Sequence, residues 1–335
     1  MMRLHGLMTE LSPQKWSDPE IRDFLKPITP PYIWDEFEQT YDADFAYSVK
    51  DLYRFRVNLF RDNQGAGAVF RFIPRELPSF EQITLEEGAK TLCELNRGLV
   101  LVTGPTGSGK STTLASIIHY LNRTKSYHII TIEDPIEFVY PSQKSLIHQR
   151  ELRKHTGSYQ EALSYALRQD PDVILVGEMR DLETTRLAIE ASETGHLVFA
   201  TLHTNTAYST ISRIINQFGE EEQELIRIML ADNLKGVICQ NLLRREDQEG
   251  RIAAREIWLY STAGANLIRE NKIHQIPSLI DGNQEMGMIS LNASLASLVG
   301  KRMISPETAW QCSMDQKDLS GRLQRLGYRM EGGYG

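Results

Sequence analysis

The stretch from Leu99 to Leu121, LVLVTGPTGSGKSTTLASIIHYL, decides the fold of this chain. Its first four residues are apolar and are typical of a buried strand, and the run Ser111–Leu121 is compatible with a helix. Between them, GPTGSGKS at residues 104–111 matches the pattern G-x-x-x-x-G-K-[ST] at every fixed position. Because the loop lies between a strand and a helix, a phosphate-binding loop is favoured over an ordinary glycine-rich turn.

This loop predicts a site for a nucleotide with Mg²⁺. Its glycines let backbone N–H groups turn inward around phosphates, and the helix N-terminus adds partial positive charge. Lys110 would bridge the β- and γ-phosphates, and the Ser111 hydroxyl would hold the metal. The residues expected to bind the nucleotide here are Gly104, Pro105, Thr106, Gly107, Ser108, Gly109, Lys110, Ser111 and Thr112.

Downstream of the loop, short apolar strands alternate with helical patterns. Such alternation favours βαβ units and therefore an α/β fold, with a mostly parallel sheet covered by helices. After about residue 206 the pattern is mainly helical, apart from one late strand pair. Strands are expected at Gly98–Val102, Tyr127–Ile132, Val173–Val176, Leu197–Thr201, Val237–Leu243 and Arg251–Tyr260, and helices near Tyr159–Arg168 and from Leu182.

The first 75 residues follow a different pattern. Apolar and polar residues alternate in Tyr53–Phe60, and Asp44–Val49 and Ala66–Ile73 are rich in aromatic and aliphatic residues, as strands are. We expect a small α+β domain with an antiparallel sheet over residues 1–75. Two prolines in Pro74–Ser79 disfavour helix, which predicts a linker at residues 76–81 and a second domain over residues 82–335.

Composition excludes several classes of protein. The chain has 335 residues, 41% hydrophobic and 24% charged, which suits roughly two globular domains. No apolar run approaches the roughly 20 residues of a membrane span, and the N-terminus lacks the apolar region of a secretory signal. A net charge of -7 argues against stable nucleic-acid binding. Cys93, Cys239 and Cys312 form no C-x-x-C pair, so we expect reduced cytoplasmic thiols and no zinc site.

Acidic residues follow two of the expected strands. A phosphate-loop fold needs a second strand that delivers an acid beside Mg²⁺, and Asp172–Glu178, DVILVGE, is the best candidate. Glu178 follows its apolar run, at the strand end where ligands bind in open α/β sheets. The alternative for Glu178 is a cap for the helix from Leu182. For Glu133, in IEDP, a plain turn and an active-site acid are equally supported.

Two histidines, His196 and His203, flank the expected strand Leu197–Thr201. No third metal ligand is nearby, so a metal site is not expected. Each histidine is either a hydrogen-bonding sensor of the γ-phosphate or a structural residue. His148 and His155 are expected to be structural.

Together these segments resemble the type II/IV secretion ATPase superfamily, the GspE/PilT family, which drives type II secretion and type IV pili. The segments are GPTGSGKST, ITIEDPIEF, RQDPDVILVGEMRDLET and ETGHLVFATLHT. Within the superfamily, RFRVNLFRDNQGAGAVFRFIP and NLIREN are similar to PilT-like retraction motors. The resemblance implies a PAS-like N-terminal domain, here without its first strand, and then a RecA-like ATPase domain with a helical C-terminal part.

The resemblance also implies ATP and Mg²⁺ as cofactors and a role for each site residue. Glu178 is the Walker B acid, which holds Mg²⁺ together with Ser111. Glu133 and His203 act at the catalytic centre, and His196 contacts the nucleotide. Arg56 and Arg71 match arginines that reach nucleotide phosphates; the alternative for both is simple exposure to solvent on a strand.

As a whole, the resemblance implies a homohexameric ATPase that powers type IV pilus retraction, and so twitching motility, at the cytoplasmic face of the bacterial inner membrane. Its expected partners are an inner-membrane pilus platform protein and a paralogous accessory ATPase. The alternatives are a pilus-assembly or secretion-system ATPase of the same superfamily and a weakly hydrolysing accessory ring. One segment departs from the retraction pattern, because AIRNLIRE is usual where Ala263–Glu270 reads AGANLIRE.

Overall fold

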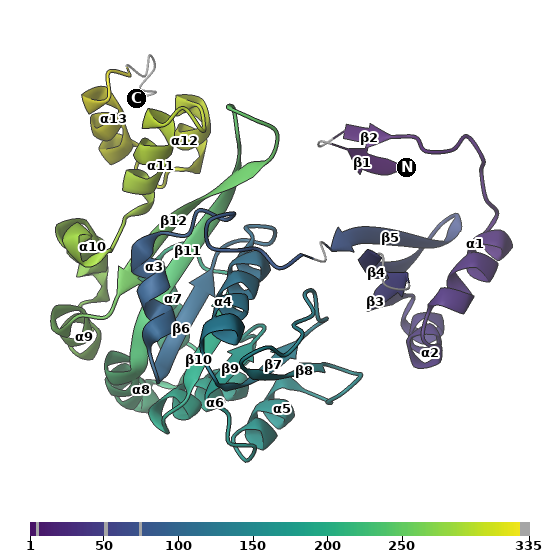
Figure 1. The fold of residues 1–335 in the computed structure, drawn as a ribbon, viewed down its shortest axis with the longest axis horizontal. Coiled ribbons are helices and arrows are strands. Elements are labelled where there is room, and N and C mark those ends of the chain that lie inside the picture. Colours follow the sequence, from purple (N-terminus) through teal and green to yellow (C-terminus); the bar gives the residue numbers. More distant parts are fainter. Residues whose placement is uncertain (5–6, 50–52, 74–75, 329–335) are drawn as a thin grey trace. The chain divides into compact units, whose positions relative to one another are not determined.

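The computed structural model describes residues 1–4, 7–49, 53–73 and 76–328. The chain divides into two compact units, Met1–Arg75 and Glu76–Gly335 (Figure 1). The expected linker, residues 76–81, is neither helix nor strand, and Pro74 and Arg75, which precede it, lie outside the described residues.

The first unit packs two helices against an antiparallel sheet of three strands in the order β3-β4-β5. The strands are β3 (Asp42–Val49), β4 (Tyr53–Asp62) and β5 (Gly65–Ile73), and the helices are α1 (Asp18–Leu25) and α2 (Pro31–Thr40), joined by a 3-10 turn at Lys26–Ile28. A separate hairpin of β1 (Met2–Leu4) and β2 (Leu7–Thr9) precedes them. Phe37, Val57 and Leu59 are fully buried between helices and sheet.

The second unit contains a seven-stranded sheet in the order β12-β11-β6-β10-β9-β7-β8. All neighbouring strands are parallel except β11 and β12, which pair antiparallel. The strands are β6 (Gly98–Thr103), β7 (His128–Glu133), β8 (Leu146–Glu151), β9 (Val173–Val176), β10 (Leu197–Leu202), β11 (Leu234–Arg244) and β12 (Arg251–Leu259). The predicted parallel sheet and the late strand pair are therefore confirmed, and β8 is an additional strand.

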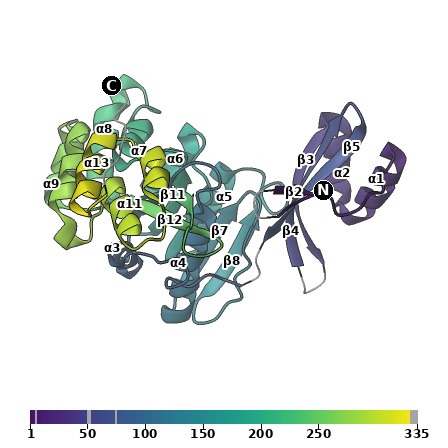
Figure 2. The same cartoon turned by 90° about the horizontal axis from the view of Figure 1, so that it is seen from above.

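Helices cover both faces of this sheet, which explains why β6, β9 and β10 are buried along their whole length. Figure 2 shows α3 and α4 on one side of the sheet and α6, α7 and α8 on the other. The bounds are α3 (Glu87–Thr91, followed by a 3-10 turn at Leu92–Glu94), α4 (Lys110–Thr124), α5 (Tyr159–Ala166), α6 (Leu182–Glu193), α7 (Ala207–Ile215) and α8 (Glu220–Asn233).

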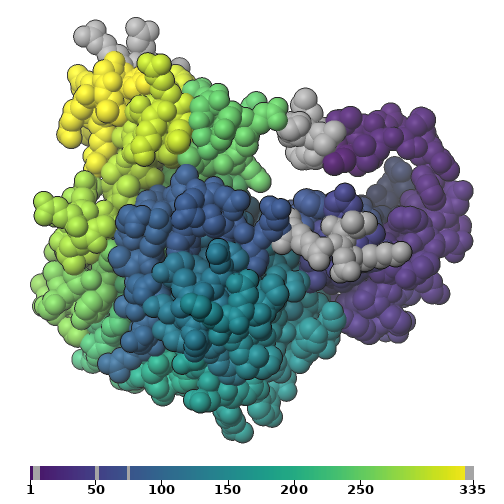
Figure 3. Space-filling view, viewed as in Figure 1, coloured from purple at the N-terminus to yellow at the C-terminus, as the bar shows by residue number. Residues whose placement is uncertain are grey.

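The C-terminal part is helical, as the sequence predicts. Its helices are α9 (Thr262–Arg269), α10 (Ile276–Gly282), α11 (Leu291–Gly300), α12 (Pro306–Cys312) and α13 (Gln316–Arg325), with 3-10 turns at Ile273–Gln275 and Gln284–Met286. Around the fully buried Leu295, Leu319 and Leu323, helices α11–α13 form a small core together with Ile252 and Ala254 of β12. Figure 3 shows these helices in yellow, beside the green β11–β12 hairpin. Among the helices of the described residues, none combines the length and apolar character needed to cross a bilayer.

Candidate nucleotide site

Four adjacent strands of the sheet, in the order β6-β10-β9-β7, end at the same edge. Thr103, the last residue of β6, pairs with Leu202, the last of β10. Val176, the last of β9, pairs with Ile132 of β7. Because the carboxyl ends of parallel strands meet at one edge, the residues that follow them lie together. They are the phosphate loop after β6, His203 after β10, Glu178 after β9, and Glu133 at the end of β7.

The phosphate loop joins β6 directly to α4, which begins at Lys110. Gly104 has a φ of 136° and passes so close to β11 that a Cβ there would lie 2.3 Å from the Gln240 carbonyl oxygen. The Lys110 Nζ donates to the carbonyl oxygens of Gly104 (2.7 Å) and Pro105 (3.2 Å), so the lysine folds across the loop. Burial lowers the pKa of Lys110, and the charges of Glu178 and Glu137 oppose this effect.

The two residues after Lys110 lie on the first turn of α4. Ser111 is exposed, and Thr112 is half-buried. The nine residues that the sequence predicts to bind nucleotide therefore form one continuous loop and helix start. This arrangement offers backbone N–H groups, a positive helix end and an ammonium group to a phosphate chain.

Both oxygens of the Glu178 carboxylate have a partner. His203 Nε2 lies 2.9 Å from Oε1, and Arg180 Nη2 lies 2.8 Å from Oε2. Burial raises the pKa of Glu178, but the hydrogen bonds and charges of Arg180 and His203 outweigh it and hold the pKa below its usual value. The carboxylate therefore stays ionised at neutral pH.

Glu178 is not the cap of α6. Asp181 takes that position, and its side chain accepts from the Thr184 N–H at 2.8 Å. Arg180 is not among the site residues predicted from the sequence. Its spacing in the sequence indicates the contact with Glu178, because a residue two places beyond Glu178 in an extended segment lies on the same side of the chain.

Glu133 is a partly buried residue at the end of β7. Its Oε1 accepts from the Thr131 hydroxyl (2.7 Å) and from the Gln149 amide on β8 (3.1 Å). Burial raises its pKa to about 7, and these two hydrogen bonds counteract only part of the effect. A carboxyl group with this pKa can gain or lose a proton near neutral pH.

The turn after β7 is made by the residues that follow Glu133. The bond between Asp134 and Pro135 is cis, and the Asp134 carboxylate lies 3.9 Å from the guanidinium of Arg153. Glu133 itself lies beside the Walker B segment, because the Gly177 N–H donates to the Ile132 carbonyl oxygen at 2.8 Å. The geometry therefore favours an active-site acid over a turn residue at this position.

The two candidate histidines lie at opposite ends of β10. His203 follows the strand and contacts Glu178, whereas His196 precedes it. A strand of this length separates them by about 20 Å, at about 3.3 Å per residue. The Nδ1 of His196 lies 2.9 Å from the Ala191 carbonyl oxygen, in the last turn of α6. The structure therefore does not bring His196 to the phosphate loop of its own chain, and its contacts are those of a structural histidine.

Arg56 and Arg71 belong to the first unit. They are direct cross-strand partners on β4 and β5, so their side chains share one face of that sheet. The Arg56 Nε lies 3.8 Å from an Asp44 carboxylate oxygen, and Arg71 is exposed. Their approach to a nucleotide remains a prediction.

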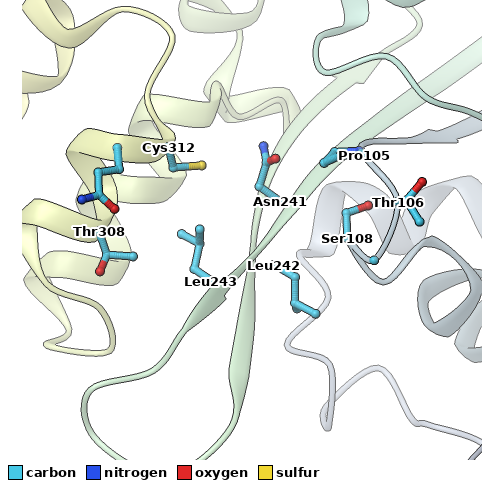
Figure 4. Close-up of a pocket in the computed structure, with 10 residues that line it drawn as sticks. Pro105, Thr106, Ser108, Asn241, Leu242, Leu243, Thr308 and Cys312 are labelled. Carbon is cyan, nitrogen blue, oxygen red and sulfur yellow. The ribbon is translucent and has the colours of Figure 1, made fainter. Parts of the chain in front are cut away.

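A pocket of about 290 Å³ opens behind the phosphate loop (Figure 4). One wall is the outer side of the loop, the floor is β11, and the far wall is α12. Figure 4 shows β11 passing between the loop that carries Ser108 and the helix that carries Thr308 and Cys312. The C-terminal helices and the phosphate loop thus share one strand as their common support. The lining residues are Pro105, Thr106, Gly107, Ser108, Asn241, Leu242, Leu243, Thr308, Gln311 and Cys312.

A phosphate loop that faces an ionised acid, a second acid and a histidine across parallel strands defines the class of P-loop nucleotide hydrolases. The family model described as type II/IV secretion system protein matches residues 41–297, and the chain belongs to this family.

Relatives and solved structures agree with this family. The chain is 48% identical over 320 residues to the twitching motility protein of Neisseria gonorrhoeae, covering 96% of this chain and 86% of the relative. It is 52% identical over 274 residues to the type IV pilus retractation ATPase PilT of Pseudomonas aeruginosa, covering 82% and 79%. The crystal structure of the pilus retraction motor PilT with bound ADP is similar at a TM-score of 0.82 and 46% identity, covering 89% of this chain and 85% of that one.

Proposed function

We propose that this chain is an ATPase motor that hydrolyses ATP to ADP and phosphate to power type IV pilus retraction, and so twitching motility. The observation that carries the proposal is the meeting of the Lys110 loop and the ionised Glu178 at one sheet edge. Similarity to the retraction ATPase of Pseudomonas aeruginosa along 82% of this chain supports the direction of work. The related crystal structure with bound ADP supports the nucleotide.

The residues of the site suit Mg²⁺·ATP. Ser111 offers an exposed hydroxyl and Glu178 an ionised carboxylate, both hard oxygen ligands of the kind Mg²⁺ takes beside nucleotide phosphates. No group of three or more His, Cys, Asp or Glu side chains that could hold a metal by itself occurs in the described part of the chain, so the metal would arrive with its nucleotide. When bound, Mg²⁺ would neutralise charge that develops on the phosphates.

We assign the remaining steps to the two acids and His203. The loop N–H groups and Lys110 hold the β- and γ-phosphates. Each carboxylate oxygen of Glu178 has a second lone pair, so the acid could hold the metal while it keeps its contact with Arg180. Glu133, with its pKa near neutrality, takes the proton of the attacking water. His203 can then turn its Nε2 toward the phosphate that leaves.

The segment that departs from the retraction pattern keeps its helix. Gly264 and Ala265 are buried on α9, whereas Asn266 and Arg269 are exposed. A Cβ at Gly264 would lie 2.9 Å from a ring carbon of Trp258, so the indole occupies the space that a larger side chain would need. The small residue and the large neighbour compensate each other, so the altered segment remains a packed helix.

We further propose a homohexameric ring at the cytoplasmic face of the inner membrane, working on a pilus platform protein and beside a paralogous accessory ATPase. These partners follow from the resemblance to retraction motors. In such a ring Arg56 and Arg71 would approach nucleotide phosphates.

Two experiments test the proposal. Lys110→Ala should reduce ATP turnover by more than tenfold in a folded protein, because the charge that faces the transferred phosphoryl group is lost. Deletion of the gene in its native host should leave cells with an excess of pili and no surface motility. Cells without pili would instead indicate an assembly motor.

A further inference from the structure

The side chain of Gln240, on β11, is hydrogen-bonded to the phosphate loop on the side of the loop that faces β11. Its Nε2 donates to the carbonyl oxygen of Ser108 at 2.7 Å. Its Oε1 accepts from the Thr113 hydroxyl, on α4, at 2.8 Å. Both Gln240 and Thr113 are 1% exposed, so the two bonds lie out of reach of water. A single buried amide therefore connects the loop to the helix that follows it.

The bond to Ser108 fixes the direction of one peptide group in the loop. In a planar trans peptide, the C=O and the N–H point to opposite sides. Because the Ser108 carbonyl points toward β11, the N–H of Gly109 points away from β11. Backbone N–H groups directed in this way at the start of a helix are the donors that phosphate oxygens require.

The loop also packs closely on Gln240 at both of its ends. A Cβ at Gly104 would lie 2.3 Å from the Gln240 backbone oxygen, and a Cβ at Gly109 would lie 3.2 Å from the Gln240 Nε2. Figure 4 shows the next residue of β11, Asn241, beside the loop that carries Ser108. Gln240 therefore contacts both the beginning and the end of the loop, and the loop packs against β11.

We propose that Gln240 is a positioning residue for nucleotide binding, which keeps the Ser108–Gly109 peptide turned so that the Gly109 N–H faces the phosphates. The inference rests on the proposed function. Without the amide, this peptide can turn over and present a carbonyl oxygen to the phosphate chain, which repels it. Phosphate contacts of this loop exist both before and during the reaction, so the loss raises Kd and KM much more than it lowers kcat.

The decisive variant is Gln240→Met, which keeps the length of the side chain and removes both hydrogen bonds. Titration calorimetry of the full chain with Mg·ADP should give a Kd about tenfold higher than that of the wild type, with kcat within about twofold. The matched control is Asn122→Leu at the other end of α4. Asn122 is also fully buried and also makes two side-chain hydrogen bonds, to Pro141 and Gln143. Its loss should lower thermal stability to a similar extent and leave Kd unchanged.

A second variant tests the same proposal if Gln240→Met does not fold. Gln240→Glu retains an acceptor for Thr113 but sets a carboxylate against the Ser108 carbonyl, so it should weaken ADP binding as strongly. Wild-type affinity for ADP in either folded variant would overturn the inference, and Gln240 would then be a purely structural residue. Failure of the wild-type protein itself to bind ADP would count against the proposed function instead.

Discussion

At the scale of single residues, the site contains two acids whose surroundings push their pKa values apart. Glu178 is held ionised by Arg180 and His203, whereas burial raises the pKa of Glu133 to about 7. A pair of carboxyl groups separated in this way divides the work between an electrostatic role and a proton-transfer role. In the sequence the two acids cannot be told apart in this way, because each follows an apolar strand.

The raised pKa of Glu133 predicts a pH dependence for the free enzyme. Below pH 7 its carboxyl holds a proton and cannot accept another, so kcat/KM should rise as the pH increases through about 7. Glu133→Gln should be at least tenfold slower at pH 8, and its profile should lose this rise. The measurement is steady-state ATPase activity from pH 5.5 to 8.5. An unchanged profile in the variant would return Glu133 to a structural role.

Stability should show the opposite trend for the same group. In the unfolded chain this carboxyl ionises near its usual pKa of 4.5, whereas the fold raises the value to about 7. The folded protein therefore retains the proton between these values, and the contribution of Glu133 to stability decreases as the pH rises through that window. Urea titrations of wild type and Glu133→Gln at pH 5 and 7.5 should show a smaller decrease in the variant.

At the scale of elements, the packing of α9 requires a residue without a side chain at position 264. Gly264 lies against the indole of Trp258 and the side chain of Leu279. Gly264→Ile should destabilise the protein by about 1–3 kcal/mol, because overpacking costs more than the gain in helix propensity. Ala263→Ile, one residue earlier on the exposed side of α9, is the control and should change stability little. Equal stability of the two variants in thermal unfolding would contradict the packing argument.

The segment before α3 is anchored by a buried arginine. Arg255, on β12, is 1% exposed; its guanidinium donates to the carbonyl oxygens of Ile83 and Thr84 and pairs with Glu86 at 2.9 Å. Arg255→Met leaves these acceptors without a donor and should cost about 3–5 kcal/mol in denaturant unfolding. Arg245→Met, which breaks the solvent-accessible pair with Asp247, should cost less than about 1 kcal/mol. A small loss at Arg255 would show that the segment is held by its apolar contacts.

The elements show where sequence patterns suffice and where they fail. Buried parallel strands are short apolar runs, so β6, β9 and β10 could be located directly. The edge strand β8, LIHQRE, has no such run and was missed. Strand geometry alone could have separated His196 from His203, because residues at the two ends of a strand cannot share one edge of a sheet. Contacts between residues distant in the chain have no local sequence pattern. Those made by Gln240, Gln149 and Arg255 could therefore not be predicted.

At the scale of the whole molecule, Glu256 lies on the strand that connects the histidine segment to the C-terminal helices. It is 8% exposed on β12 and accepts from the Ala207 N–H, at the start of α7, at 2.7 Å. The N–H of its neighbour Arg255 donates to the Ser294 hydroxyl on α11 at 3.1 Å. Because α7 begins four residues after His203, these two bonds connect the histidine segment through β12 to α11.

The predicted role of the two arginines of the first unit in ATP turnover also concerns the whole molecule. Arg56 and Arg71 are direct cross-strand partners, and like charges in such positions repel. Asp44, whose carboxylate lies 3.8 Å from the Arg56 Nε, offsets part of this repulsion, and a phosphate group between the arginines would offset more. An arginine that neutralises transition-state charge contributes roughly 10³–10⁵ in rate in well-studied P-loop proteins. We therefore expect Arg56→Ala/Arg71→Ala to lose most ATP turnover and to retain its fold.

A mixing experiment determines whether these arginines act on their own subunit or on a neighbour. Lys110→Ala subunits and Arg56→Ala/Arg71→Ala subunits should each be inactive alone. If the arginines act in trans, an interface between the two kinds of subunit can combine an intact phosphate loop with intact arginines, and ATP turnover returns on mixing. Wild-type activity should then also rise steeply with protein concentration, because hydrolysis requires assembly. No recovery in rings shown by mass spectrometry to be mixed would exclude action in trans and leave the arginines serving the site of their own subunit.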